Sequence, residues 1–105
     1  MKTLSRDEVR QKSDEATVVE VLSEDDFSNF HLPGAINVPL GQNFEQRIQA
    51  AVPNKAQPVI VYCMDTECSA SEKAAEKLDQ LGYEQVYDYE AGKLDWKQAG
   101  LPVER

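Results

Sequence analysis

The stretch VIVYCMDTECSAS, residues 59–71, places an apolar run directly before a polar loop that contains two cysteines. Val59 to Tyr62 have the near-continuous apolar character of a central strand covered on both faces. After the loop, apolar residues recur on one helical face until a glycine ends the pattern: Ala70, Ala74, Leu78, Leu81 and then Gly82. We therefore expect a strand, a loop and a helix in succession, with Cys63 at the carboxyl end of the strand.

The same alternation extends along the chain. Two other segments, TVVEVL (17–22) and EQVYDY (84–89), are rich in β-branched and aromatic residues and predict strands. Helices are predicted to begin at Ser5, Ser23, Asn43 and Ser69 and over residues 91–100, with capping boxes from Ser5 to Glu8 and from Ser69 to Glu72. Alternating strands and helices predict an α/β fold, a mainly parallel central sheet with helices on both faces, and a single domain over residues 1–105.

The composition argues against two classes of partner. The chain has 105 residues, and 11 basic against 19 acidic side chains give a formal charge of −8. Such a surface repels nucleic acid and anionic membranes, and no basic cluster offsets it. The N-terminus has no secretory-signal pattern and no apolar run is long enough to span a membrane, so we expect a cytoplasmic protein with free or functional thiols.

Cys63 is a candidate nucleophile. A helix that begins immediately after the loop directs its unpaired N–H groups at the carboxyl end of the strand, and these groups favour a thiolate. The plain alternative is that Cys63 is a small buried hydrophobic residue, as most free cysteines are.

Several motifs in order and spacing resemble a single-domain rhodanese. They are HLPGAIN (31–37), VYC (61–63), ECSAS leading into a helix, LGY (81–83) and VYDYEAGKLDWKQAGLPVE (86–104). The resemblance implies a rhodanese fold and places Cys63 at the family's active-site cysteine. It further implies sulfur transfer: the Cys63 thiolate takes a sulfane sulfur from a donor, holds it as a persulfide and passes it to a thiol or other nucleophilic acceptor. No metal or organic cofactor is required for that chemistry.

The active-site loop, residues 64–69 (Met64, Asp65, Thr66, Glu67, Cys68 and Ser69), departs from the family pattern. Rhodaneses often carry Gly at the position of Thr66 and Arg at the position of Cys68. If the Gly position requires a positive φ, Thr66 would be strained and the loop would run differently. Without the Arg, and with acidic Asp65 and Glu67 at the rim, a divalent anion such as thiosulfate is disfavoured and the thiol pKa is raised. We expect a persulfide or a protein partner to be the better sulfur donor.

The loop is also expected to bind the transferred sulfur. Its backbone N–H groups at residues 64–68, with the hydroxyls of Thr66 and Ser69, form the expected cradle.

Cys68 leaves two further functions open. It could resolve a persulfide or sulfenic acid on Cys63 by forming a disulfide, which would make the loop a dithiol redox site. Alternatively, the altered loop could serve recognition in a catalytically silent rhodanese fold that acts as an interaction module.

Other readings are weaker. A cysteine phosphatase needs an Arg to hold phosphate, but Ser69 stands six residues after Cys63. A zinc site would have to combine both cysteines with the distant His31, without the usual paired spacings. We expect His31 to bond to backbone in a turn and Trp96 to lie in the core. At the end of the first strand, Glu20 and Leu22 replace an Asp and an Arg common in the family, a difference that we assign to structure.

Overall fold

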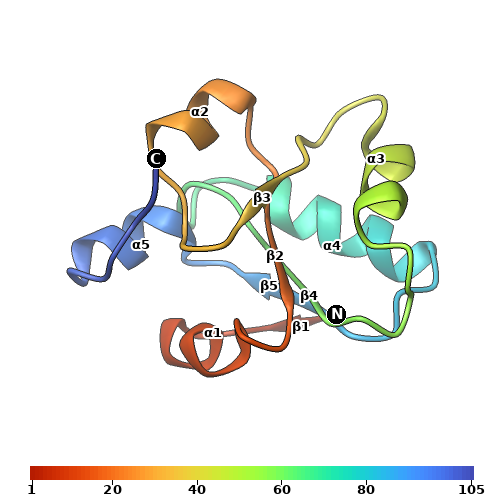
Figure 1. The fold of residues 1–105 in the computed structure, drawn as a ribbon, viewed down its shortest axis with the longest axis horizontal. Helices are drawn as coiled ribbons and strands as arrows, with labels where there is room; N and C mark the ends of the chain where they lie inside the picture. Colours follow the sequence, from red (N-terminus) through yellow and green to blue (C-terminus); the bar gives the residue numbers. More distant parts are fainter.

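A five-stranded parallel sheet forms the centre of the molecule in a computed structural model that describes residues 1–105 (Figure 1). The strands lie in the order β1-β5-β4-β2-β3, and every pair of neighbours is parallel. Their bounds are β1 Lys2–Thr3, β2 Thr17–Glu20, β3 Ile36–Asn37, β4 Val59–Tyr62 and β5 Val86–Tyr89. The central strand β4 is buried along its whole length, which explains its uninterrupted apolar sequence.

Four helices connect the strands, α1 Arg6–Lys12, α2 Glu24–Asn29, α3 Phe44–Ala51 and α4 Ala70–Gln80, and a fifth, α5 Gly92–Gln98, follows β5. The capping box at the start of α1 is confirmed, since Glu8 N donates to Ser5 Oγ and Ser5 N donates to the Glu8 carboxylate. Ser23 caps α2 as expected, by accepting a hydrogen bond from Asp26 N.

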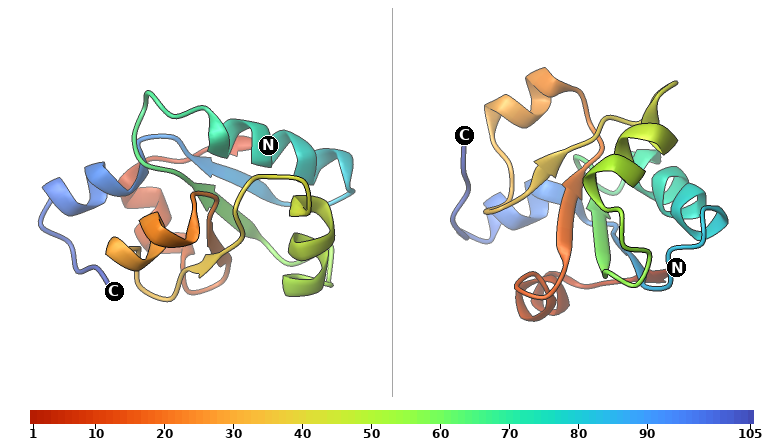
Figure 2. Two further views of the ribbon diagram at one scale, coloured as in Figure 1. Left: turned by 90° about the horizontal axis from the view of Figure 1, so that it is seen from above. Right: turned by 45° about the vertical axis from the view of Figure 1, so that its right-hand side comes forward.

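The helices cover both faces of the sheet, as the alternating pattern predicts (Figure 2). On one face, α3 and α4 pack on a core that includes Val61 and Cys63. On the other face, Val9 of α1 and Trp96 of α5 pack with Ile60 and Tyr62 of β4. Alternate residues of β4 therefore point into two separate cores, and Cys63 belongs to the core beneath α4.

Three local expectations need correction. The two-residue strand β1 was not predicted, because its exposed Lys2 and Thr3 carry no apolar signal. The strand expected over residues 17–22 ends at Glu20. The capping box expected from Ser69 to Glu72 is wrong, since the Ser69 side chain makes no capping hydrogen bond in the backbone conformation that Ser69 adopts.

Candidate active site

The α5 N-terminus holds the loop that follows Cys63. The carbonyl oxygen of Cys63 accepts a hydrogen bond from Lys93 N at 3.0 Å, and that of Met64 accepts one from Leu94 N, also at 3.0 Å. Gly92 makes this approach possible, because it adopts φ +79° and presents no side chain to the Met64 backbone. The first residues of α5 thus fix the backbone on either side of the cysteine.

Asp65 organises the loop from within. Its carbonyl oxygen accepts from Cys68 N at 3.2 Å, and its carboxylate accepts from Glu67 N at 3.0 Å. The N–H groups of residues 67 and 68, two of the five expected in the sulfur cradle, are therefore already engaged. Those of Met64, Asp65 and Thr66 donate to no other group of the protein.

Thr66 is not strained, because no residue other than glycine has a positive φ. The loop therefore does not adopt the positive φ that a glycine at this position would permit.

The Cys63 thiol is fully buried between the loop and α4. Its Sγ donates to the carbonyl oxygen of Cys68 at 3.4 Å and lies 3.6 Å from Ser71 Oγ. Burial raises the pKa of the thiol to about 11; the adjacent Cys68 side chain acts in the same direction, and the Ser71 hydroxyl and N–H oppose it. We expected the pKa of this thiol to be raised by the acidic rim and lowered by the helix N-terminus; burial is instead the main cause that raises the pKa, and the first turn of α4 lowers it through Ser71.

The residue that sequence reasoning missed is Ser71. We expected the hydroxyls of Thr66 and Ser69 beside the sulfur, but the hydroxyl that contacts it belongs to Ser71, which is 2% exposed in the first turn of α4. A signal was available: Ser71 lies one residue after Ala70 and three before Ala74, within the run that predicts the buried helix face.

Below the loop, Glu20 and Lys93 form an ion pair in which both side chains are completely buried. Lys93 Nζ also donates to the carbonyl oxygens of Asp26 and Phe30, each at 2.7 Å, and Tyr62 donates to the second oxygen of Glu20. Burial raises the pKa of Glu20, while the hydrogen bonds from Lys93 and Tyr62 counteract that rise. The assignment of Glu20 to structure therefore agrees with its position, and its partner is Lys93.

His31 and Trp96 occupy the places expected of them. His31 Nδ1 lies 2.9 Å from the Phe27 carbonyl oxygen, and its ring stacks on that of Phe27. Trp96 is 6% exposed and its indole N–H donates to the carbonyl of Pro102. No group of three or more His, Cys, Asp or Glu side chains is placed to hold a metal ion. No helix is long and apolar enough to cross a bilayer.

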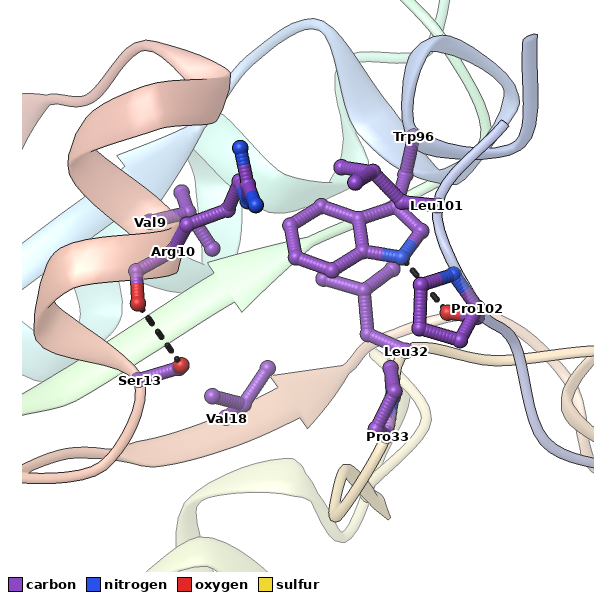
Figure 3. A pocket seen from close by; sticks show the side chains of 9 residues that line it. All are labelled: Val9, Arg10, Ser13, Val18, Leu32, Pro33, Trp96, Leu101 and Pro102. Atoms are coloured by element: carbon purple, nitrogen blue, oxygen red, sulfur yellow. Dashed lines mark hydrogen bonds between the residues drawn. The ribbon is translucent and has the colours of Figure 1, made fainter. Parts of the chain in front are cut away.

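Two depressions lie near these elements. A pocket of about 210 Å³ opens between α1, α5 and the C-terminal segment, with Trp96 and Leu32 among its apolar walls (Figure 3). It lies on the face of the sheet opposite Cys63, so it contains none of the predicted site residues. A second depression, beside the active-site loop, is bordered by Asp65, Thr66 and Asp95, and the Asp95 carboxylate is ion-paired with Arg6 at 3.0 Å.

Comparison with protein families decides the family. The model of the rhodanese-like domain matches residues 5–99, nearly the whole chain. The chain belongs to the rhodanese-like domain family. The fold and the family expected from the sequence are thereby confirmed.

Several relatives place this rhodanese-like domain among known proteins. This chain is 30% identical over 95 residues to the HTH-type transcriptional regulator Rv0324 of Mycobacterium tuberculosis. The match covers 90% of this chain and 40% of the regulator. It is 32% identical over 96 residues to the uncharacterized protein YqhL of Bacillus subtilis, and this match covers 91% of this chain and 72% of YqhL. It is 37% identical over 68 residues to the thiosulfate sulfurtransferase PspE of Escherichia coli, and this match covers 65% of this chain and 62% of PspE.

Solved structures agree on the fold. A thiosulfate sulfurtransferase from Pseudomonas aeruginosa superposes with a TM-score of 0.85 at 26% identity, covering 100% of this chain and 20% of that one. A protein from Bacillus halodurans superposes with a TM-score of 0.87 at 24% identity, covering 98% of this chain and 76% of that one. At this identity the likeness supports the fold alone.

Proposed function

We propose that this rhodanese-like domain is a sulfurtransferase or sulfur carrier in which Cys63 holds the transferred sulfur as a persulfide. The observation that carries the proposal is the placement of the Cys63 sulfur, at the end of β4 and against the first turn of α4, where Ser71 presents both a hydroxyl and an N–H group. The relatives named as thiosulfate sulfurtransferases are consistent with this chemistry.

The reaction has two balanced halves. In the first, the Cys63 thiolate attacks the outer sulfur of a donor persulfide; the new Cys63 S–S bond forms as the donor S–S bond breaks, and the donor leaves as a thiolate. In the second, a nucleophilic acceptor attacks the outer sulfur on Cys63, and Cys63 leaves as a thiolate. The unpaired N–H groups of Met64, Asp65 and Thr66 are available to stabilise the negative outer sulfur.

The surroundings of the loop favour a persulfide over thiosulfate as donor. Asp65 and Glu67 are acidic, and no Arg or Lys lines the depression beside the loop; Asp95, which also borders it, is ion-paired with Arg6. A divalent anion would approach against this charge, whereas a low-molecular-weight persulfide carries less charge.

A test uses three proteins: the wild type, Cys63→Ser and Cys68→Ser. Each is incubated with a low-molecular-weight persulfide, desalted and weighed by intact mass spectrometry. The proposal expects one added sulfur on the wild type and on Cys68→Ser, and none on Cys63→Ser. An added sulfur that persists in Cys63→Ser would contradict it.

The second candidate function is a dithiol site, which the nearness of Cys68 favours: Cys63 Sγ donates to the Cys68 carbonyl oxygen at 3.4 Å. Here Cys68 attacks the inner sulfur of the Cys63 persulfide, a Cys63–Cys68 disulfide forms, and hydrosulfide leaves with the electron pair of the broken S–S bond. In the same experiment this function predicts sulfide release and loss of two hydrogens in the wild type, with a stable persulfide only in Cys68→Ser.

A further inference from the structure

The pocket between α1, α5 and the C-terminal segment has a buried apolar floor (Figure 3). Val9, Val18, Leu32 and Trp96 form this floor, and each of these side chains is at most 6% exposed. They belong to the core on the face of the sheet opposite Cys63. The proposed sulfur transfer uses none of these residues, so it gives the pocket no role.

Hydrogen bonds hold the walls of the pocket in place. Trp96 Nε1 donates to the carbonyl oxygen of Pro102 at 2.8 Å, which fixes the C-terminal segment beside α5. Two backbone hydrogen bonds of 2.9 Å between His31 and Glu104 fix the same segment next to Leu32. A ligand would therefore enter a pocket that is already ordered, and this lowers the cost of binding.

The volume of the pocket limits the size of a ligand. The pocket measures about 210 Å³, and Arg10, Pro33 and Pro102 at its edge are exposed, so a ligand can enter from solvent. An apolar cavity of about 150 Å³ holds one benzene molecule. The pocket therefore has room for a six-membered ring with a small polar substituent, or for a branched chain of similar size. It is too small for a nucleotide-sized cofactor.

Arg10 is the only charged residue that lines the pocket. Its side chain extends from α1 toward the ring of Trp96 (Figure 3). The five ion pairs of the chain do not include Arg10, although Asp7 and Asp14 lie near it in the sequence. The Ser13 hydroxyl donates to the backbone carbonyl oxygen of Arg10 at 3.4 Å and leaves the guanidinium unpaired. A cation without a partner thus stands beside an apolar floor.

These features select an anion with an apolar body. A guanidinium presents two parallel N–H groups to a carboxylate, and such a pair is stronger than a hydrogen bond between neutral groups. The single cation balances one negative charge, and the formal charge of −8 on the chain disfavours a dianion such as a phosphate monoester.

We propose that this pocket binds a small monocarboxylic acid, with its apolar body against Trp96 and Leu32 and its carboxylate paired with Arg10. The site lies on the other face of the sheet from Cys63 and goes beyond the proposed sulfur transfer.

Trp96 makes binding directly measurable, because it is the single tryptophan of the chain and lies in the wall of the pocket. The test titrates its fluorescence with cyclohexanecarboxylate, which does not absorb where tryptophan does, at constant ionic strength. We expect a saturable change with a Kd on the order of 1 mM for a ligand of this size. Cyclohexanecarboxamide has the same shape without the charge, and it should bind about tenfold more weakly.

Arg10→Gln should weaken binding of the acid about tenfold and leave binding of the amide unchanged. Lys12→Gln is the matched control, since Lys12 is a cation on the same helix that does not line the pocket, and it should leave the Kd for the acid unchanged. Ser13→Leu places an apolar side chain in the pocket and should abolish the response to both compounds. Circular dichroism establishes that each variant is folded, and Arg10→Gln, which alters an exposed side chain, decides the outcome if Ser13→Leu is unfolded.

Three results would overturn the proposal. They are the absence of a saturable change at acid concentrations up to about tenfold above the expected Kd, equal affinity for the acid and the amide, and an affinity for the acid that Arg10→Gln leaves unchanged. The titration involves no sulfur donor, and Cys63→Ser should give the same Kd as the wild type. The outcome is therefore independent of the proposed function.

Discussion

Gly92 lies directly against the backbone of Met64: a Cβ atom at position 92 would fall 2.5 Å from both the carbonyl carbon and the carbonyl oxygen of Met64. This contact joins the start of α5 to the residue that follows the candidate nucleophile. The loop geometry around Cys63 therefore depends on a glycine almost thirty residues further along the chain.

Gly92→Ala should displace the active-site loop. The substitution strains a backbone at φ +79° by about 1–2 kcal/mol and adds an overpacking cost of about 1–3 kcal/mol. We expect a matching loss of unfolding free energy in urea and a large loss of sulfur uptake by Cys63. Gly100→Ala is the control, since Gly100 has the same φ of +79° but no atom within 4 Å of its Cβ position. Equal sulfur uptake by both variants would show that the contact with Met64 does not position the loop.

The buried pair of Glu20 and Lys93 should be strongly coupled. Lys93→Met leaves the Glu20 carboxyl without its cation in a fully buried position and should lower the unfolding free energy by about 3–5 kcal/mol. Combining it with Glu20→Leu removes both charges and should recover most of that loss. Urea denaturation of the two single variants and the double variant gives the coupling energy, and additive losses would mean that the two side chains do not interact.

Asp88 should make stability depend on pH. Because its pKa is raised in the folded protein above the ordinary 3.8, the folded chain binds more protons than the unfolded chain between the two values. The unfolding free energy therefore falls as pH rises through this window, by at most about 1.4 kcal/mol per pH unit. Relative to the wild type, Asp88→Asn should gain stability as pH increases toward neutrality. A constant difference between the two proteins over that range would show that the pKa of Asp88 is not raised.

Charge at the loop rim should set the choice of donor. Asp65→Asn removes the negative charge of Asp65. The asparagine keeps a side-chain oxygen that can accept the hydrogen bond from Glu67 N, so the loop hydrogen bond is preserved. Together with Glu67→Gln, it should increase kcat/KM for thiosulfate about tenfold, and it should change kcat/KM for a low-molecular-weight persulfide much less. The same increase for both donors would indicate a general effect on the thiol rather than on anion approach.

Local patterns predicted most of the fold and the position of the nucleophile. The apolar run before Cys63 identified β4, and Ser5 with Glu8 identified the start of α1, because each signal lies within a few adjacent residues. The partners of Cys63 were harder to predict, because they depend on which strands are neighbours. Strand alternation in residues 84–89 places Asp88 on the same face as Val86, but only the β4–β5 pairing, with Asp88 opposite Val61, places it on the Cys63 side of the sheet.

Lys93 shows a second limit of sequence reasoning. A lysine in the first turn of a short helix suggests a solvated charge, yet Lys93 is fully buried because Glu20 and two carbonyl groups from residues 26 and 30 surround its amine. These groups come from chain segments more than sixty residues away, so no local spacing predicts the contact.

The most direct test of the central claim is the intact mass of the wild type, Cys63→Ser and Cys68→Ser after incubation with a low-molecular-weight persulfide. We predict one added sulfur that requires Cys63 and is retained in Cys68→Ser. No mass change in any of the three folded proteins would contradict sulfur transfer at Cys63.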